Sequence, residues 1–277
     1  MPETRPEFAV YEPAEDLLTF VHRHMYGCCD HDDPVSLSIS PTGGIFLSYV
    51  AGAPLRIRMR EQEIETRSRL FIGGQLRHEN PLLTSCGKFR LLGIEFRPTA
   101  FYRLFHRDAD AFTDRMTDFA KVFPQLARDL ENRLSPADVI TQLIETLEEF
   151  LRALIPDARE APIVESAITE IAARQGLITV EELSGLTGYS ARQLHRYFLT
   201  SIGIPPKHYA KIVQINSVVS ALMAEDLAKL QELSLGHGYF DHAHFIHDFQ
   251  RFIHTSPSAF LTSKFEFLQT YLGNVSR

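Results

Sequence analysis

The C-terminal part of the chain contains one local pattern twice, and this repetition limits the available folds more than any other feature. In each copy a short apolar helix is followed by a glycine turn and then by a second helix with a capping residue at its start. The turn glycines are Gly188 and Gly238. Two short helices joined by a tight turn are typical of helix-turn-helix units. We therefore predict two such units, at about residues 179–200 and 227–253.

The predicted helix starts carry strong local signals. Thr179 is followed three residues later by Glu182, and Ser190 is followed by Gln193. Each pair matches the capping box, in which both side chains satisfy backbone groups at a helix N-terminus. Asp241 is the expected cap of the corresponding helix in the second unit, which carries Phe245 and Phe249 inward.

A long helix is predicted between the two units, over residues 206–224. At 1.5 Å per residue its 19 residues span roughly 28 Å. Successive major-groove faces of a duplex lie about 34 Å apart. A rod of this length is able to place two reading helices in adjacent groove segments of one DNA molecule.

The second helix of the first unit has a polar side opposite its apolar positions Leu194 and Phe198. Arginine and glutamine near a helix start are able to make bidentate contacts with guanine and adenine edges. The polar residues on this side are Arg192, Gln193, His195 and Arg196.

The N-terminal part has a different pattern. Short runs that alternate or are rich in β-formers occur at 35–39, 45–50, 55–59 and 89–96, separated by glycine and proline. They predict an antiparallel sheet, in a cupin-like sandwich or a small barrel. Apolar positions Leu17, Leu18, Val21 and Met25 predict a helix within residues 11–26.

Residues after Ala100 return to a helical pattern. A seam of apolar residues is expected either to pack an amphipathic helix on its own domain or to form a homodimer contact; it consists of Ile140, Leu143, Leu147, Phe150 and Leu154. The polar, proline-flanked segment 156–162 predicts a linker. We therefore expect an α+β chain with three parts: a β-rich sensor domain (1–119), a helical segment (120–158) and an all-α domain (159–277).

Residues 179–262 resemble the DNA-binding domain of the AraC/XylS family of bacterial transcription regulators. The matching segments are VEEL (180–183), GYSARQLHRYF (188–198), IGIPPKHY (202–209), GYFDHAHFIHDF (238–249) and TSPSAF (255–260). Residues 1 to about 115 resemble, more loosely, an uncharacterised β-rich sensor-like domain that precedes such DNA-binding domains. EFRPTA at 95–100 is the best local match.

The resemblance implies a cytoplasmic, ligand-responsive regulator, for example an activator, with double-stranded DNA, RNA polymerase and an unknown small-molecule effector as partners. It implies base contacts from Arg192, His195 and Arg196 in the first unit, and groove-facing positions for His242 and His247 in the second. Ser190 and Thr179, with the helix N-termini that they cap, are expected to contact phosphate.

Three positions depart from the family pattern. His247 stands where an arginine is usual, Gln214 stands where the linker helix usually has an arginine near its start, and Ile253-His254 replaces phenylalanine-glycine. Because the second set of groove residues contains histidine and no permanent cation, we hypothesise that its DNA contact strengthens when histidine is protonated.

Two groups of histidines are candidates for metal sites. One lies in the second unit, at His237, His242, His244, His247 and His254, where the positions fall on different helix faces. The other comprises His22, His24, Cys28, Cys29 and His31, which suit zinc, copper(I) or redox sensing by chemistry. The expectation for the second group is a helix end running into a polar loop. We expect no metal and no cofactor.

Composition narrows the remaining classes. The net charge of −7 argues against a general polyanion binder, and three cysteines suit a reducing compartment. The start of the chain lacks the apolar core of a signal peptide, and no run is long enough to span a membrane. No catalytic motif is present, so we expect no enzyme activity.

Two alternatives remain at this point. Arg56, Arg58 and Arg60 share one strand face, which is either solvated or meets an anionic ligand or the acidic helices. The near-neutral C-terminal part leaves open a protein-interaction module of the same fold, an antagonist of a related regulator with weak or no DNA binding.

Overall fold

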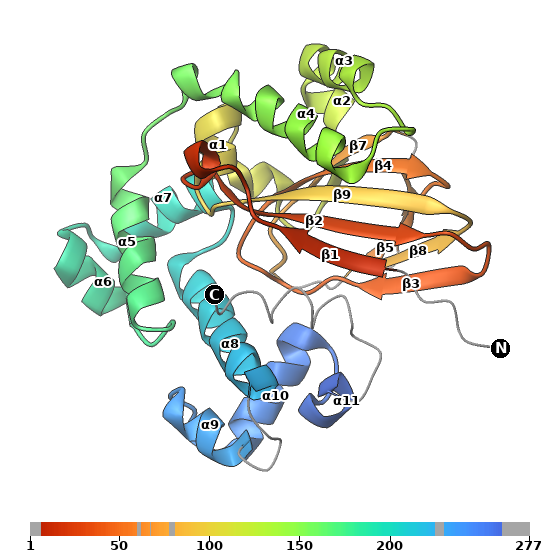
Figure 1. Cartoon of the computed structure of the whole chain (residues 1–277). Helices are drawn as coiled ribbons and strands as arrows, with labels where there is room; N and C mark the ends of the chain where they lie inside the picture. Colours follow the sequence, from red (N-terminus) through yellow and green to blue (C-terminus); the bar gives the residue numbers. More distant parts are fainter. Residues whose placement is uncertain (1–6, 60–61, 67, 78–80, 225–229, 262–277) are drawn as a thin grey trace.

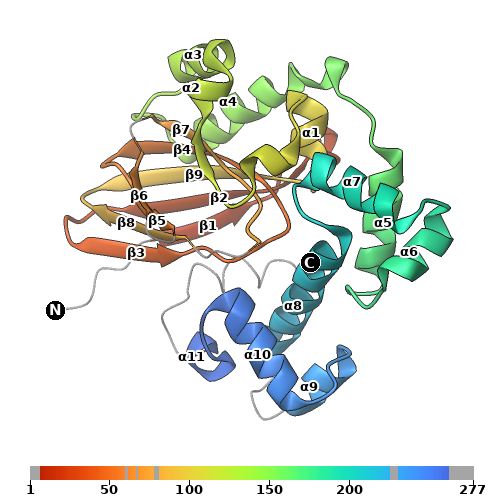
Figure 2. The same cartoon turned by 180° about the vertical axis from the view of Figure 1, so that it is seen from behind.

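The computed structural model describes residues 7–59, 62–66, 68–77, 81–224 and 230–261, which form two antiparallel sheets followed by a group of helices (Figures 1 and 2). The larger sheet has the order β1-β2-β9-β4-β7-β10, and the smaller one β3-β8-β5-β6. The larger sheet contains β1 (Glu7–Tyr11), β2 (Val21–Cys29), β4 (Phe46–Gly52), β7 (Leu70–Gly73), β9 (Phe89–Phe96) and β10 (Met116–Asp118). The smaller contains β3 (Pro34–Ser38), β5 (Arg56–Met59), β6 (Gln62–Glu65) and β8 (Leu82–Cys86). The predicted α+β class with a β-rich N-terminal part is confirmed.

The two sheets pack face to face as a sandwich. Their shared core includes Val35, Leu37 and Leu83 from the smaller sheet, and Val50 and Phe89 from the larger one. Alternate residues of each strand point to opposite faces, so the four predicted strands present one apolar row inward. All four are confirmed to within two residues at either end.

The outer face of the smaller sheet is solvated. Arg56 and Arg58 are exposed, whereas Ile57 between them is 1 % exposed. The side chain of Arg56 pairs with Glu65 on the neighbouring strand, with 3.5 Å between Nε and Oε2. Of the two alternatives for these arginines, Arg56 and Arg58 follow the first, a strand face exposed to solvent. Arg60 lies outside the described residues.

The predicted helix within residues 11–26 is wrong. A short 3-10 helix, η1 (Glu15–Leu17), is followed directly by β2, which pairs with β1 on one side and β9 on the other. Both faces of β2 are covered, so buried residues do not alternate with exposed ones along it. Without that alternation, the spacing of Leu17, Val21 and Met25 is the same as that expected for an amphipathic helix.

Helices cover the other face of the larger sheet (Figure 1). They are α1 (Ala100–Phe105), η2 (Ala109–Phe112), α2 (Phe119–Val122), α3 (Pro124–Arg133) and α4 (Ile140–Arg152), followed by η3 (Ile155–Asp157). One continuous core joins them to the sheet and includes Tyr49, Ile94 and Phe101.

The apolar seam of α4 belongs to this core. Leu143 and Leu147 are 1 % exposed and Phe150 is 5 % exposed, while Ile140 and Leu154 pack against the same cluster. The predicted homodimer contact through these residues is therefore corrected, because their side chains pack inside their own domain. The same heptad spacing suits both arrangements, and only the position of the sheet distinguishes them.

The C-terminal helices follow the predicted plan. They are α5 (Pro162–Ala173), α6 (Val180–Thr187), α7 (Ala191–Ile202), α8 (Pro206–Ala224), α9 (Leu230–Gly236), α10 (His242–Ile253) and α11 (Pro257–Leu261). Leu227, predicted to begin the helix before Gly238, lies outside the described residues. No described helix is long and apolar enough to cross a membrane.

The capping signals are confirmed at atomic detail. The hydroxyl of Thr179 accepts from the backbone N–H of Glu182, and Ser190 does the same for Gln193. The carboxylate of Asp241 accepts from the backbone of His244 at 2.7 Å. These local bonds fix where α6, α7 and α10 begin.

The two parts of the chain contact each other beside α7 and α8. The hydroxyl of Thr113, which follows η2, donates to the carbonyl of Gly203 at the end of α7, at 2.7 Å. Gly203 has φ of +95°, and a Cβ there would stand 2.9 Å from the carbonyl oxygen of Ala109. Glycine is therefore required at this junction.

Candidate functional site

The outer side of α7 is an exposed polar surface. Arg192, Gln193, His195 and Arg196 are all exposed, whereas Leu194 and Phe198 are completely buried. The division between the two sides is the predicted one. The helix is held from beneath by the second core cluster, so these four side chains project from a rigid element.

The two arginines of α7 are available for an external anion or base. Among the described residues neither guanidinium forms an ion pair, and that of Arg196 lies over the ring of Tyr197, 5.2 Å from its centroid. Arginine stacks on aromatic faces through its planar guanidinium. Arg192 and Arg196 are four residues apart and therefore share a face of the helix.

Gln193 is already in use within the protein. Its Oε1 accepts from the backbone N–H of Ser190 at 3.0 Å and from the Ser190 hydroxyl at 2.9 Å. Bidentate reading of adenine needs both ends of the amide. Gln193 therefore presents only its amide donors unless the capping box opens, so of the four predicted base contacts it fits bidentate reading least.

The N-termini of α6 and α7 differ as phosphate sites. The carboxylate of Glu182 accepts from the backbone of Thr179 at 2.7 Å, and this hydrogen bond keeps the pKa of Glu182 below its usual value. A carboxylate thus occupies the N-terminus of α6, with Glu181 beside it. The first turn of α7 has no acidic residue. Of the two predicted phosphate contacts, Ser190 fits an anion and Thr179 does not.

The corresponding helix of the second unit is α10. His242 and His247 are exposed, as their motif positions require, and Phe245 and Phe249 are fully buried. Arg251, one turn after His247 on the same face, is also exposed. Arg251 lies between two of the segments that match the family, so it was not among the predicted contacts. Its spacing of four residues from His247 was the signal that could have identified it.

The departure at Gln214 has a structural role. Its Nε2 donates to the carbonyl of His237 at 2.7 Å, while its Oε1 accepts from Lys211 at 2.8 Å. Lys211 also pairs with Asp248 at 2.8 Å. Polar side chains of α8 therefore fasten α9 and α10, and Gln214 is not placed as a DNA contact.

The histidines of the second unit do not converge. His237 bonds the carbonyl of Leu233 through Nδ1, and His244 lies 3.6 Å from Asp248 and against the ring of Tyr239. Among the described residues no group of three metal-ligating side chains is present anywhere.

The N-terminal histidine and cysteine group is dispersed by β2. Cys28 and Cys29 are adjacent in a strand and point to opposite faces, so they cannot share a ligand. Burial raises the pKa of the Cys28 thiol, which makes it less reactive. His24 is completely buried and bonds Glu148 of α4 at 3.0 Å. The expected helix end running into a polar loop is thus wrong, and His24 connects β2 to α4.

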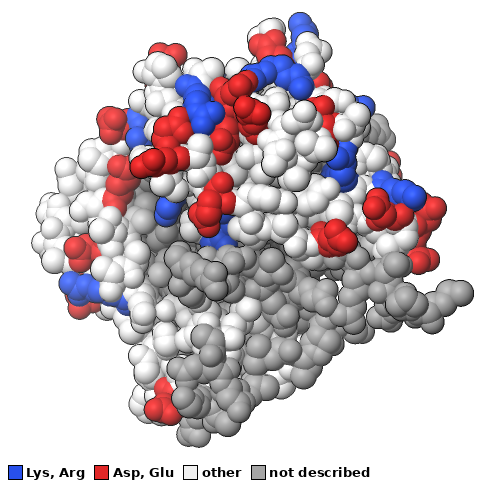
Figure 3. All heavy atoms as spheres, in the orientation of Figure 1, with Lys and Arg blue, Asp and Glu red and all other residues white. Residues whose placement is uncertain are grey.

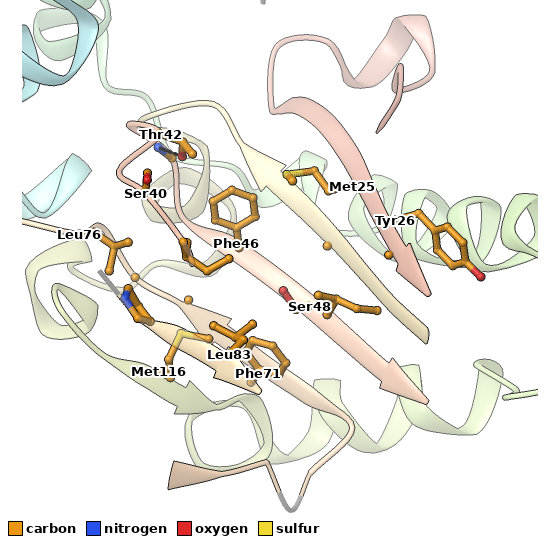
Figure 4. Close-up of a pocket in the computed structure, with 18 residues that line it drawn as sticks. Met25, Tyr26, Ser40, Thr42, Phe46, Ser48, Phe71, Leu76, Leu83 and Met116 are labelled. Atoms are coloured by element: carbon orange, nitrogen blue, oxygen red, sulfur yellow. Dashed lines mark hydrogen bonds between the residues drawn. The ribbon is translucent and has the colours of Figure 1, made fainter. Parts of the chain in front are cut away.

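A pocket lies between the two sheets, and the sequence interpretation did not anticipate it (Figure 4). Its walls include Met25, Phe46, Phe71, Leu83 and Met116. Its volume is about 80 Å³. Among the described residues that line the pocket, none has a charged side chain.

Strand glycines create this space. Gly93 of β9 faces Ser48 of β4 and Met25 of β2 in the strand register, and Gly73 of β7 faces Phe46. Residues directly opposite each other in an antiparallel pair share a face, so these side chains all point toward the smaller sheet. Glycine inside a strand often marks a place where another group approaches closely.

Family models match both parts of the chain. Residues 183–263 match a model described as a helix-turn-helix domain, of the AraC type. Residues 9–118 match a domain of unknown function (DUF6597). None of the curated proteins compared with the chain matches it.

Several solved structures are similar at low identity. ToxT from Vibrio cholerae has 13 % identity over 93 % of this chain and 98 % of that one, with a TM-score of 0.46. ToxT from Vibrio cholerae O395 bound to (E)-4-(8-methylnaphthalen-1-yl)but-3-enoic acid has 10 % identity over the same shares, with a TM-score of 0.48. The AraC-like transcriptional activator CuxR has 13 % identity over 78 % and 86 %, with a TM-score of 0.25.

Proposed function

Because residues 183–263 are an AraC-type helix-turn-helix domain, we propose that the chain is a sequence-specific, DNA-binding transcription regulator. Arg192, His195 and Arg196 of α7 enter a major groove and contact base edges, and Ser190 with the α7 N-terminus binds phosphate. α10 contributes weaker contacts through His242, His247 and Arg251.

The observation that carries this proposal is the pair of arginines on α7. Both are exposed, share a face and lack an ion-pair partner among the described residues, while the helix beneath them is fixed by Leu194 and Phe198. Arginine fits the O6 and N7 acceptors of guanine as a bidentate donor. An arginine held for internal stability would pair with a carboxylate of the protein instead.

The N-terminal domain acts in this proposal as the sensor, with a small-molecule effector in the pocket between the sheets. The regulator works in the cytoplasm, without enzyme activity of its own, and acts on RNA polymerase as an activator. The division at residues 119 and 158 stays a prediction, although the helices of segment 120–158 share the core of the larger sheet.

Selection of binding sites from a randomised duplex pool with the full-length protein tests the proposal. We expect enrichment of a defined sequence and loss of that enrichment in Arg196→Ala. The control is Arg128→Ala, which removes the same charge from an exposed position of α3. Enrichment of no sequence by the wild-type protein contradicts the proposal, as does equal enrichment by Arg196→Ala.

A specific observation favours the second candidate, the protein-interaction module. Phe240, just before α10, is 88 % exposed, and Leu235 of α9 is 50 % exposed. Among the described residues visible in Figure 3, acidic and basic side chains are intermixed. The salt dependence of duplex binding separates the candidates, since a slope of several released counterions supports the regulator and a slope near zero supports the interaction module.

A further inference from the structure

The chemistry of the pocket limits what it can bind. Its described lining has no charged side chain, so a carboxylate or ammonium inside it would have no partner among these residues. Burying an unpaired charge is strongly unfavourable. The interior walls are Phe46, Phe71, Leu83 and Met116, and Tyr26 points away from the cavity (Figure 4). An uncharged, mainly hydrophobic molecule matches this lining.

One polar group in the wall lacks a partner. Ser40 is 3 % exposed, lines the pocket, and its hydroxyl has no hydrogen bond among the described residues. A second hydroxyl, on Ser48, is also in the lining. A buried hydroxyl without a partner is costly, so a ligand hydroxyl or carbonyl that bonds Ser40 would gain affinity.

The size of the pocket sets a further limit. Its volume of about 80 Å³ is about half that of an apolar cavity of about 150 Å³ known to bind benzene. The pocket in this conformation therefore holds a short alkyl chain or only part of a ring. A molecule of ring size, such as benzyl alcohol, extends through the opening of the pocket.

Loop 40–44, which forms one wall of the pocket, also contacts α8, the helix between the two helix-turn-helix units. Ser40, Thr42 and Gly44 line the pocket, and Gly43 between them packs on α8: a Cβ at Gly43 would lie 3.3 Å from the Tyr209 ring. Gly43 has φ of +95°, so this approach depends on glycine.

Two hydrogen bonds fix the same loop. Nδ2 of Asn216 in α8 donates to the carbonyl of Thr42 at 3.3 Å. Nε2 of Gln75 donates to the carbonyl of Gly43 at 2.7 Å. A molecule that fills the pocket presses on a loop that is bonded directly to α8, which gives it a physical route to the DNA-reading units.

We propose that the pocket binds an uncharged hydrophobic molecule with one hydroxyl or carbonyl group, and that loop 40–44 transmits its presence to α8. This inference rests on the proposed function for its regulatory part. The binding part stands separately, because ligand affinity is measured without DNA.

Calorimetry with three probes of one ring size tests the binding part: benzyl alcohol, toluene and benzoate. We expect benzyl alcohol to bind more tightly than toluene and benzoate not to bind. In Gly93→Ala the new methyl group meets Ser48 Oγ at 3.4 Å and occupies part of the cavity without a clash. Loss of the space of one methyl group weakens benzyl alcohol about tenfold or more.

Two further variants sharpen the result. Ser40→Ala weakens benzyl alcohol about fivefold and leaves toluene unchanged, because only the alcohol uses the hydroxyl. Gly185→Ala is the matched control for Gly93→Ala, since nothing lies within 4 Å of its Cβ. Binding of benzoate as tight as benzyl alcohol, or no effect of Gly93→Ala, overturns the assignment of ligand class and site.

The transmission part is tested by the affinity for a selected duplex with and without benzyl alcohol. We expect the alcohol to change DNA affinity in the wild-type protein and not in Asn216→Ala, which still binds the alcohol. If the alcohol binds and DNA affinity does not change, the route through the loop is overturned. If no duplex is bound under any condition, the proposed function fails, while the ligand class is still decided by calorimetry.

Discussion

Nη1 of Arg103 in α1 lies 2.6 Å from Oε1 of Glu165 in α5, and this ion pair joins the N-terminal domain to the first helix of the C-terminal group. The Arg103 side chain is 9 % exposed, its Nε donates to the carbonyl of Arg159, and its guanidinium lies over the ring of Phe20. The same Glu165 oxygen accepts from the hydroxyl of Thr99 at 3.1 Å.

Glu165→Gln is expected to loosen the contact between the two parts of the chain. The guanidinium of Arg103 keeps its other contacts but loses its anionic partner, at a cost of about 1–3 kcal/mol in the free energy of unfolding. Denaturant unfolding measures this cost. Glu170→Gln, at the surface pair with Arg174, serves as the control with a change below about 1 kcal/mol. Equal effects of the two variants would contradict the structural role of Glu165.

Stability is expected to fall as the pH drops below the ordinary histidine range. Burial lowers the pKa of His24, against the raising effect of its hydrogen bond and charge interaction with Glu148, and burial lowers the pKa of His22 to about 3. Near pH 6.5 these histidines therefore bind protons in the unfolded chain but not in the folded chain. Each such group removes up to about 1.4 kcal/mol of stability per pH unit below that value.

His24→Gln tests this pH dependence. Urea midpoints at pH 7.5, 6 and 5 should fall less steeply in the variant than in the wild-type protein, because one depressed group has been removed. His195→Gln, at an exposed position of α7, is the matched control and should leave the slope unchanged. The same steep fall in His24→Gln as in the wild-type protein would contradict the account.

Ser190→Ala and Thr179→Ala are expected to separate stability from DNA binding. Each removes an N-cap hydroxyl and costs about 1 kcal/mol of stability. Only Ser190 caps a helix whose first turn is free of carboxylates, so only Ser190→Ala should weaken DNA binding beyond the stability effect. Matched melting curves and duplex titrations give both quantities. Equal losses of DNA affinity would remove the distinction between the two helix ends.

The histidines of α10 are expected to make DNA affinity depend on pH. Histidine gains its charge near pH 6.5, so binding at fixed salt should strengthen as the pH falls from 8 to 6. Replacement of His242 and His247 by Gln should flatten this change, while the nearby cation Arg251 keeps the remaining affinity. Flat binding by the wild-type protein over this range would show that these histidines do not contribute.

The sequence predicted the C-terminal helices well because their signals are local. Thr179 with Glu182, Ser190 with Gln193, and Asp241 each form bonds within four residues, and those bonds exist in the structure. The predicted roles of the α7 and α10 side chains in DNA binding stay predictions.

The errors have a common physical origin in contacts between distant segments. β2 lies between β1 and β9 in its sheet and is covered on both faces, so its pattern did not alternate. The α4 seam showed an apolar stripe but not the sheet that covers it. The pocket depends on the register that brings Gly93 opposite Ser48, which spacing along the chain does not reveal.

Base reading by Arg196 is measured by titrating the wild-type protein and Arg196→Ala against the selected duplex and its single-base variants. We expect a loss of about 1–3 kcal/mol on the selected duplex and a loss of discrimination at one base pair. A uniform weakening across all duplexes, or equal affinities of the two proteins, would contradict base reading by Arg196.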